Sequence, residues 1–459
     1  MVCLYSLMMG SLFFCKNDET DFIDHFKVGG GAVPIILYTR DITHGRGRRD
    51  LAYAMIVSLY KSNPGTAMEA LRLCASKYGS WCDIKYFCRY VSELVINIDD
   101  RDKLIDGAID ILIYQLNMDY ASWTDALSEY LNNLRVISRP IGREILSYAA
   151  KWVPREKSAM GWLFDRIVER WAKDHYNSRY KREFRKMISE LNRELGTVEI
   201  KQCAQDFNNI IYEQIPIRTL VGQYRTFAGL DVYPKGRGVG GGGGSRLFEQ
   251  MCQNLVRIAL SVDDGRYDDM LNHIWSKNQT NYSSKDIVPI VDISAGSGGW
   301  FHAIGLGILI AQNSAHGTLI LSEHDAHSIP AGRGDSFTSI IERIRPFLSG
   351  VTDSRLDLAI HMSFETKMVS SAARVVILSQ SGSRHTQTFW SPIFYWFFGK
   401  NNDSTFMSTF MKGGAKNNDD CDYTFCDSMH MLSHYANGGT TNDYIQMILG
   451  SDRYKVQMN

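Results

Sequence analysis

The chain has 459 residues, of which 44% are hydrophobic and 22% charged, so it can bury two or three cores and is too apolar to be mainly disordered. Its 50 Lys and Arg balance its 50 Asp and Glu, which excludes attraction of the whole molecule to nucleic acid or to an anionic membrane. Such an affinity requires a local basic patch. Residues 135–186 provide one, because they contain 14 Lys and Arg against 6 Asp and Glu.

The nine cysteines are odd in number, scattered along the chain and without a Cys-x-x-Cys pair. This pattern favours reduced thiols in a cytoplasmic protein, or in a virus particle if the chain is viral, over disulfides or zinc fingers. Residues 2–15 are apolar, which leaves a signal peptide and a packed first helix as alternatives. No basic segment or small-residue cleavage site accompanies them, and this favours the helix. No other segment could span a bilayer, so no membrane partner is expected.

Helical spacing of apolar residues extends from about residue 20 to residue 260. Leu51, Met55 and Leu59 share one helix face, and AsnProGly at 63–65 breaks the chain after it. Two further faces are expected, formed by Ile105, Ala108, Ile109, Leu112 and Leu116 and by Leu127, Tyr130, Leu131 and Leu134. Thr124 or Asp125 would begin the second of these helices. Helices joined by short turns predict a HEAT-like array, although we find no fixed-period repeat.

A glycine-rich tract at 235–246 interrupts the helical pattern before Leu247, Met251, Leu255 and Ile258 resume it. Its composition favours a flexible loop or linker. The alternative is a phosphate contact through its backbone N–H groups and the flanking cations Lys235, Arg237 and Arg246. The tract lacks the Gly-Lys-Ser/Thr ending of a P-loop, so it gives no support for nucleotide hydrolysis.

After residue 286, short apolar runs alternate with helical segments. The runs at 287–292, 318–322 and 374–379 are typical of strands in a parallel sheet that is covered on both faces. Helices are expected at 300–312 and 340–347, and later strands at 394–398 and 429–432. Residues 323–327, GluHisAspAlaHis, are expected to form a surface loop.

Polar residues follow the first of these strands, where ligands of a doubly wound sheet bind. Asp292 and Ser294 begin a near match to the metal-binding pattern Asp-x-Ser-x-Ser, but Gly296 occupies the last position and the hydroxyl comes one residue later, at Ser297. Thr352 is the expected fourth ligand. Such oxygen ligands suit Mg²⁺, which is the possible cofactor of a degenerate site here. The alternative is a hydroxyl-rich turn, because Ser379, Gln380 and Ser381 stand where a second aspartate is expected.

Several segments together resemble the Ro/TROVE family and its relatives in plants, fungi and large viruses. TyrThrArgAsp at 38–41 with GlyArgGlyArgArgAspLeu at 45–51, and TyrGlySerTrpCysAsp at 78–83, are similar to family signatures. Further likeness lies at 150–157, 184–189 and 197–203. The resemblance implies a helical ring or horseshoe that binds RNA, followed by a von Willebrand factor A (vWA) domain with a degenerate metal-dependent adhesion site.

Two clusters of basic residues fit RNA binding, because arginines beside aromatic residues suit phosphate contact and base stacking. The candidate residues are Arg46, Arg48 and Arg49, which lie near Arg40, and Arg179, Lys181, Arg182, Arg185 and Lys186, which lie beside Tyr176 and Tyr180. The other interpretation is that the first cluster forms internal ion pairs among Arg40, Asp41, Arg49 and Asp50, while the second is a solvated helix face.

We therefore expect a multidomain α and α/β protein. Residues 1–285 would form the helical TROVE-like module, and residues 286–459 a vWA-like domain with a doubly wound, mainly parallel sheet. The leading hypothesis is a non-enzymatic RNA-binding or ribonucleoprotein scaffold protein. The alternative is a structural or assembly protein, such as a virus-particle component, that uses the same fold for contacts with protein partners or with its own copies. An enzyme ranks third, since Asp292 lacks an assigned second carboxylate.

Overall fold

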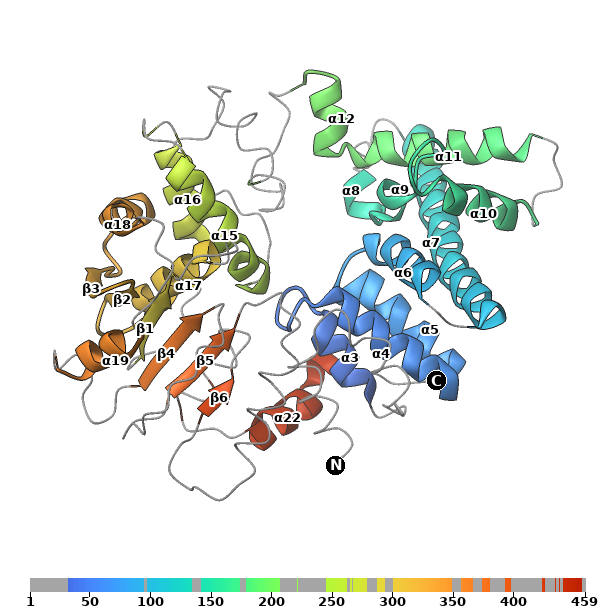
Figure 1. The fold of residues 1–459 in the computed structure, drawn as a ribbon. Coiled ribbons are helices and arrows are strands. Elements are labelled where there is room, and N and C mark those ends of the chain that lie inside the picture. Colours follow the sequence, from blue (N-terminus) through green and yellow to red (C-terminus); the bar gives the residue numbers. More distant parts are fainter. Residues whose placement is uncertain are drawn as a thin grey trace. The chain divides into compact units, whose positions relative to one another are not determined.

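The computed structural model describes residues 32–94, 97–133, 142–173, 179–206, 221, 245–261, 265, 267–278, 287–293, 300–348, 356–365, 374–379, 393–397, 423–425, 434, 437 and 441–455 (Figure 1). Contacts divide the chain into two units. The sheet unit comprises Met1–Asn17 and Ile211–Ser451, and the helical unit comprises Asp18–Ile210 and Asp452–Asn459. The chain therefore returns to the helical unit at its C-terminal end.

The described part of the helical unit consists of helices. They are α3 (Val33–Arg40), α4 (Arg49–Ser62), α5 (Pro64–Leu73), the π-helical turn η2 (Cys74–Tyr78), α6 (Cys82–Glu93), α7 (Ile98–Asn132), α8 (Gly142–Ile145), α9 (Ala149–Trp152), α10 (Gly161–Ala172), α11 (Tyr180–Leu195), α12 (Val198–Cys203) and the 3₁₀ turn η6 (Asp452–Tyr454). Within the described residues, no helix combines the length and hydrophobicity needed to cross a membrane.

The predicted helix face of Leu51, Met55 and Leu59 is confirmed, because all three side chains are buried in α4. The predicted break after α4 is also confirmed. Asn63 ends that helix, and its side chain accepts a hydrogen bond from the Thr66 N–H (3.1 Å) at the start of α5. An N-cap of this kind satisfies a backbone donor that the helix leaves unpaired.

Helix α7 differs from the prediction in its length. It contains 35 residues and passes through Thr124 and Asp125, so the predicted helix start at these residues is wrong. The Thr124 hydroxyl donates to the carbonyls of Tyr120 (3.0 Å) and Ala121 (2.8 Å), which satisfies it inside the helix. Of the face expected there, Leu127 and Tyr130 are half-buried and Leu131 is 58% exposed, while Leu134 lies outside the described residues.

The sheet unit contains one six-stranded sheet in the order β3-β2-β1-β4-β5-β6. Its strands are β1 (Ile287–Asp292), β2 (Thr318–Ser322), β3 (Ala326–Pro330), β4 (Arg374–Ser379), β5 (Ile393–Phe397) and β6 (Tyr423–Phe425). All neighbours pair in parallel except β2 and β3, which form an antiparallel hairpin. The coarse prediction of helices followed by an α/β part is confirmed. The expected loop at 323–327 is corrected, because its last two residues already belong to β3.

Helices cover both faces of this sheet, as continuous apolar strands require. On one face, Val288, Ile290 and Ile320 form a buried core with Ala359 of α19 (Leu356–Glu365). On the other face, α17 (Trp300–Asn313) lies so close to β1 that a Cβ at Gly307 would be 2.4 Å from Cγ2 of Val291. The remaining elements are α15 (Ser245–Ser261), α16 (Asp268–Asn278), α18 (Phe337–Ile344), the 3₁₀ turn η5 (Arg345–Phe347) and α22 (Thr441–Gly450).

The boundary between the units differs from the expected division at residue 285/286. Helix α15 packs on α17, and α16 packs on α18, so both helices belong to the sheet unit. Their apolar residues complete the layer over the sheet: Leu255 and Val256 are fully buried. Two expected elements, a helix within residues 2–15 and a strand at 429–432, lie outside the described residues.

Candidate functional site

Helix α11 presents a row of cations on its outer face. Phe184, Met187, Leu191 and Leu195 are buried on its inner face. The exposed side chains at helical spacing opposite them are Arg182, Arg185, Lys186, Ser189 and Arg193. We call Arg182, Arg185, Lys186 and Arg193 the α11 cation row. The row follows from amphipathic patterning, since the helix buries one apolar stripe and leaves the other side to charged residues.

Two members of the row, Arg182 and Lys186, are exposed and form no ion pair in the described part of the chain. Arg185 is 55% exposed and pairs with Glu156 (3.2 Å), and Arg193, 71% exposed, lies 3.6 Å from its neighbour Glu194. Exposed pairs of this kind are weak and exchange partners easily. The row therefore keeps an excess of positive charge that is available to an anion.

Lys181 lies beside the row but is already paired. Its Nζ is 2.6 Å from Glu156 and 2.9 Å from Asp165. The hydrogen bond from Lys181, supported by its charge and by that of Arg185, holds the pKa of Glu156 below its usual value. Glu156 thus stays ionised and anchors Lys181 and Arg185 at the end of α11. Arg179 is exposed at the N-terminal end of the same helix and also has a partner.

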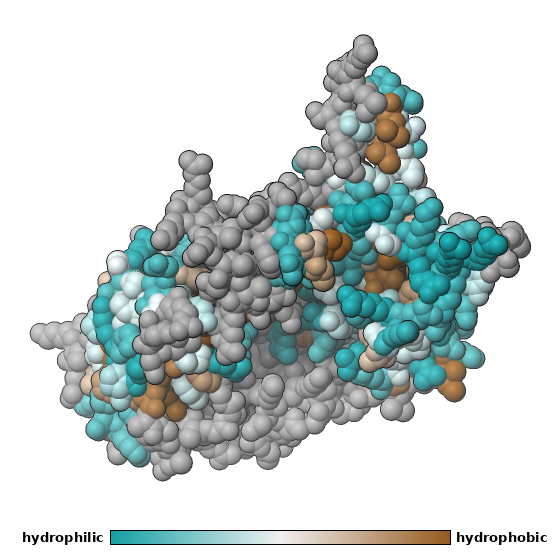
Figure 2. Space-filling model, turned by 90° about the horizontal axis from the view of Figure 1, so that it is seen from above, coloured by the Kyte–Doolittle hydropathy of each residue, from teal (hydrophilic) through white to brown (hydrophobic). Residues whose placement is uncertain are grey.

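Two cations of α10, Arg166 and Arg170, are neutralised by α7. Arg166 pairs with Asp102 (3.0 Å) and Asp106 (2.7 Å), and Arg170 pairs with Asp106 (3.2 Å) and Asp110. These pairs join α10 to α7. In the described chain, the exposed cations of residues 135–186 that form no ion pair include Arg182 and Lys186 on α11, and Arg155, Lys157 and Lys173 on other segments. Figure 2 shows hydrophilic residues over most of the described surface of the helical unit seen from above, with small hydrophobic patches between them.

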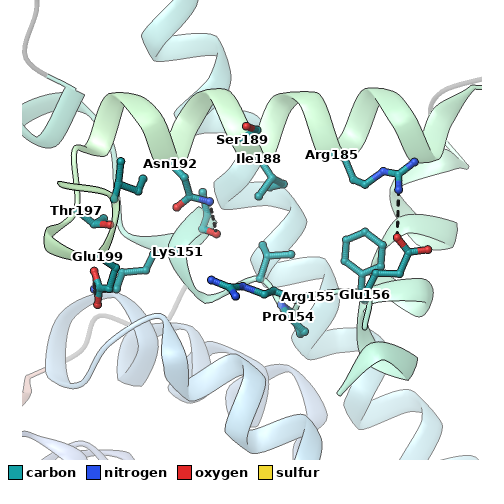
Figure 3. Close-up of a pocket in the computed structure, with 14 residues that line it drawn as sticks. Lys151, Pro154, Arg155, Glu156, Arg185, Ile188, Ser189, Asn192, Thr197 and Glu199 are labelled. Atoms are coloured by element: carbon teal, nitrogen blue, oxygen red, sulfur yellow. Dashed lines mark hydrogen bonds and ion pairs between the residues drawn. The ribbon is translucent and has the colours of Figure 1, made fainter. Parts of the chain in front are cut away.

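A groove with a volume of about 530 Å³ lies beside α11, between that helix, α12 and the turn after α9 (Figure 3). Its walls include the apolar side chains of Val153, Pro154 and Ile188. Arg155 extends beneath α11 in Figure 3, and its exposed guanidinium has no ion pair in the described residues. On the other side of the groove, Lys151 pairs with Glu199 (2.9 Å). The groove adds one uncompensated cation to those of the row.

The first predicted cluster is largely internal. Arg46 is only 1% exposed, and Arg49 lies 3.6 Å from Asp83 and 4.4 Å above the Tyr86 ring. The Arg40 Nε donates to both carboxylate oxygens of Asp83 (3.0 Å each), and Arg40 is also buried. Arg40 and Arg49 thus form internal ion pairs, as the second interpretation expected, but the partner of both is Asp83 instead of Asp41 or Asp50. Arg48 is half-buried and has a partner, so this cluster offers little charge to RNA.

The predicted metal residues are only partly described. Asp292 ends β1, is 4% exposed and has a partner, while Ser294, Ser297 and Thr352 lie outside the described residues, as do Lys235 and Arg237. The register places Asp292 opposite Ser322, which ends β2 and is fully buried. Asp292 thus lies at the carboxyl end of β1, and the strand order reverses on the other side of this strand, between β1 and β4, which is the usual ligand edge of such sheets. No group of three or more His, Cys, Asp or Glu in the described ranges could hold a metal ion.

Sequence reasoning missed three residues of these sites: Arg155, Arg193 and Ser322. Arg193 follows Lys186 by seven residues, two helical turns, so helical spacing could have found it. Ser322 could have been found as the last residue of a predicted strand next to the one that ends at Asp292. Arg155 carries no such signal, because its position beneath α11 depends on the tertiary fold.

The chain matches no model of a known protein family and no curated protein.

Proposed function

We propose that the protein is a non-enzymatic RNA-binding or ribonucleoprotein scaffold protein that contacts RNA through the α11 cation row. The proposal rests on two exposed cations, Arg182 and Lys186, which form no ion pair with any residue that the structure describes and lie in line with Arg185 and Arg193. A protein with no net charge needs such a local field to attract a polyanion. The family resemblance of the sequence points to the same partner.

The size of the row suits several phosphates. From Arg182 to Arg193 the helix rises by about 16 Å, at 1.5 Å per residue. Phosphates of one strand in a duplex are about 3.4 Å apart along the axis, so the row could contact several of them. Arg155 in the groove beside α11 would extend this surface.

Charge reversal of the row tests the proposal. In the variant Arg182→Glu, Arg185→Glu, Lys186→Glu we expect the RNA affinity at low salt to fall at least tenfold. The slope of log affinity against log salt should become shallower by about 2, since each lost phosphate contact on a single strand removes about 0.7. Fluorescence anisotropy with a labelled RNA at several salt concentrations measures both quantities.

The matched control reverses three exposed cations elsewhere in the same unit, in Lys61→Glu, Arg89→Glu, Lys103→Glu. These residues belong to α4, α6 and α7, away from α11 in the sequence. Because the two variants have the same net charge, a purely global electrostatic effect would weaken RNA binding equally in both. Equal loss, or unchanged affinity in the α11 variant, would contradict the proposal.

The proposal also includes a fold family for each of the two units. We infer that the helical unit is a HEAT-like, TROVE-type array and that the sheet unit is a vWA-like domain. The strand order 3-2-1-4-5-6 supports the second assignment, because it is an order of doubly wound sheets. Asp292 at the ligand edge would be the one carboxylate of a degenerate Mg²⁺ site, with Ser294, Ser297 and Thr352 as its further ligands.

The alternative, an assembly protein, has one observation in its favour. Helix α7 exposes several large hydrophobic side chains: Ile98, Tyr114, Met118, Tyr120 and Leu131. Tyr114 and Met118 are four residues apart, so they lie on one face of the helix. Exposed aromatic residues and Met are enriched at protein interfaces. If this face is an interface, the variant Tyr114→Ser, Met118→Ser would dissociate an oligomer in light-scattering measurements, with RNA binding unchanged.

A further inference from the structure

The C-terminal residues Asp452–Lys455 bind to the helical unit through a buried carboxylate. Asp41 lies at the end of α3 and is fully buried. Arg453 donates to both of its oxygens, from Nε to Oδ2 (2.5 Å) and from Nη2 to Oδ1 (3.1 Å). The Tyr454 hydroxyl donates to Oδ2 as well (3.0 Å). Such a forked pair requires the planar guanidinium of arginine and cannot be reproduced by lysine.

Aromatic rings enclose the same segment. The Tyr454 ring contacts Tyr38 edge to face (5.8 Å between ring centres) and stacks on Tyr78 (5.7 Å). The Arg453 guanidinium lies 5.5 Å from the centre of the Tyr78 ring. The Tyr78 hydroxyl donates a hydrogen bond to the Arg453 carbonyl, so the site contacts the backbone of the segment as well as its side chains. Tyr454 is 4% exposed in this position.

The site is held in shape by contacts that do not involve the C-terminal residues. The N–H groups of Thr43 (2.8 Å) and His44 (3.2 Å) donate to Asp41 Oδ1, and the Ile42 N–H donates to the Tyr78 carbonyl (2.9 Å). Burial alone would raise the pKa of Asp41. The hydrogen bonds from Arg453, from these two N–H groups and from Tyr454 outweigh burial and lower the pKa. The carboxylate is therefore ionised with Arg453 bound, and the Thr43 and His44 N–H groups hold it in place without help from the C-terminal residues.

The C-terminal segment is also a separate piece of chain. Residues 441–450 form α22, which belongs to the sheet unit together with Ser451, and residues 452–455 belong to the helical unit. A short segment that leaves one unit and inserts its side chains into a preformed site on another resembles a bound peptide ligand. Tyr38, Asp41 and Tyr78 come from the TyrThrArgAsp and TyrGlySerTrpCysAsp motifs, which the RNA-binding proposal leaves without a role.

We propose that Tyr38, Asp41 and Tyr78 form a peptide-binding site specific for an Arg–Tyr segment, and that the chain's own Arg453 and Tyr454 occupy it. We call it the Arg–Tyr site. While these residues are bound, the site is closed to a second Arg–Tyr segment. Once they are removed or weakened, the site accepts the same sequence as a free peptide. This proposal does not depend on RNA binding.

Peptide binding to a full-length variant tests it. The variant Arg453→Ala, Tyr454→Ala empties the site, and a fluorescein-labelled peptide with the sequence of residues 450–456 is the probe. We expect saturable binding in fluorescence anisotropy. The unaltered protein should bind the peptide at least tenfold more weakly, because its tethered segment competes at an effective concentration on the order of millimolar. A peptide carrying R453K should also bind at least tenfold more weakly to the emptied variant.

Two controls make the result decisive. Adding Asp41→Asn to the emptied variant should abolish binding of the peptide. A chain ending at Ser451 serves as a second emptied form and should bind the peptide as the double variant does. The proposal is overturned if both emptied forms are folded by circular dichroism and neither binds the peptide, or if the R453K peptide binds equally well. It is also overturned if both forms unfold, since the segment is then part of the core and not a separable ligand.

Discussion

Asp83→Asn is expected to destabilise the helical unit by roughly 3–5 kcal/mol, because it removes one partner of a buried ion pair. Arg40 and Asp83 are both buried, and Arg40 Nη2 lies 2.8 Å from Asp83 Oδ2. Burial alone would lower the pKa of Arg40, but the adjacent Asp83 carboxylate outweighs it and raises the pKa. The guanidinium therefore stays charged, and the variant leaves this charge uncompensated.

The same carboxylate also holds neighbouring groups. The Tyr53 hydroxyl donates to Asp83 Oδ1 (2.7 Å), and the Ser80 N–H donates to Oδ2 (3.0 Å). Burial, and then the charge of Asp83, raise the pKa of Tyr53 well above its usual value, so this hydroxyl remains a donor. Native-state hydrogen exchange of the amides in α3, α4 and α6 measures the effect. Protection there should fall roughly a hundredfold or more.

Asp102→Asn is the matched control for Asp83→Asn. It removes the same charge from the same unit, but Asp102 is 49% exposed in its pair with Arg166, and exposed pairs contribute about 0–1 kcal/mol. If both variants reduced amide protection to the same small extent, the buried Arg40–Asp83 pair would not stabilise the helical unit as we predict.

Gly305→Leu is expected to destabilise the sheet unit by roughly 3 kcal/mol through overpacking. A Cβ at Gly305 of α17 would lie 2.6 Å from the Cβ of Cys252 and 3.1 Å from its backbone carbon and oxygen. Backbone atoms of α15 cannot give way without moving the helix. Leucine has a better helix propensity than glycine, by up to about 1 kcal/mol, so a net loss of stability must come from packing.

Hydrogen exchange of β1 and α15 tests this prediction, with Gly334→Leu as the control. Gly334 is exposed in a turn, and a Cβ there would meet nothing within 4 Å. Gly305→Leu should lower protection in β1 and α15 and leave that of α4 unchanged. Protection that fell in α4 instead would contradict the assignment of α15 to the sheet unit.

Strands and helix faces that follow from the local spacing of apolar residues were predicted correctly from the sequence. Strands β1, β2 and β4 are continuous apolar runs, and the helix face of Leu51, Met55 and Leu59 has regular spacing. Strand β3 was not predicted, because AlaHisSerIlePro has a single buried hydrophobic residue, Ile329, and is held mainly by antiparallel pairing with β2. Helix α7 was predicted as two helices, because Thr124 is a good cap residue that here bonds within the helix.

Which charged side chains form ion pairs could not be predicted from the sequence, because ion pairing depends on the tertiary fold. Arg166 is neutralised by Asp102, 64 residues earlier, while Arg182 on the next helix has no ion pair in the described chain. Asp41 is bound by Arg453, 412 residues later. The basic motifs near the N-terminus therefore indicated RNA contacts when only the sequence was considered. In the structure, Arg40 and Arg46 are buried.

The nucleic acid content of the natively purified protein tests the central claim most directly. The absorbance ratio at 260 and 280 nm is measured with and without ribonuclease, together with the mass of the particle in solution. We predict co-purifying RNA that ribonuclease removes, with a corresponding loss of mass. A protein that is free of nucleic acid, and whose oligomeric mass ribonuclease does not change, would contradict RNA binding and favour the assembly function.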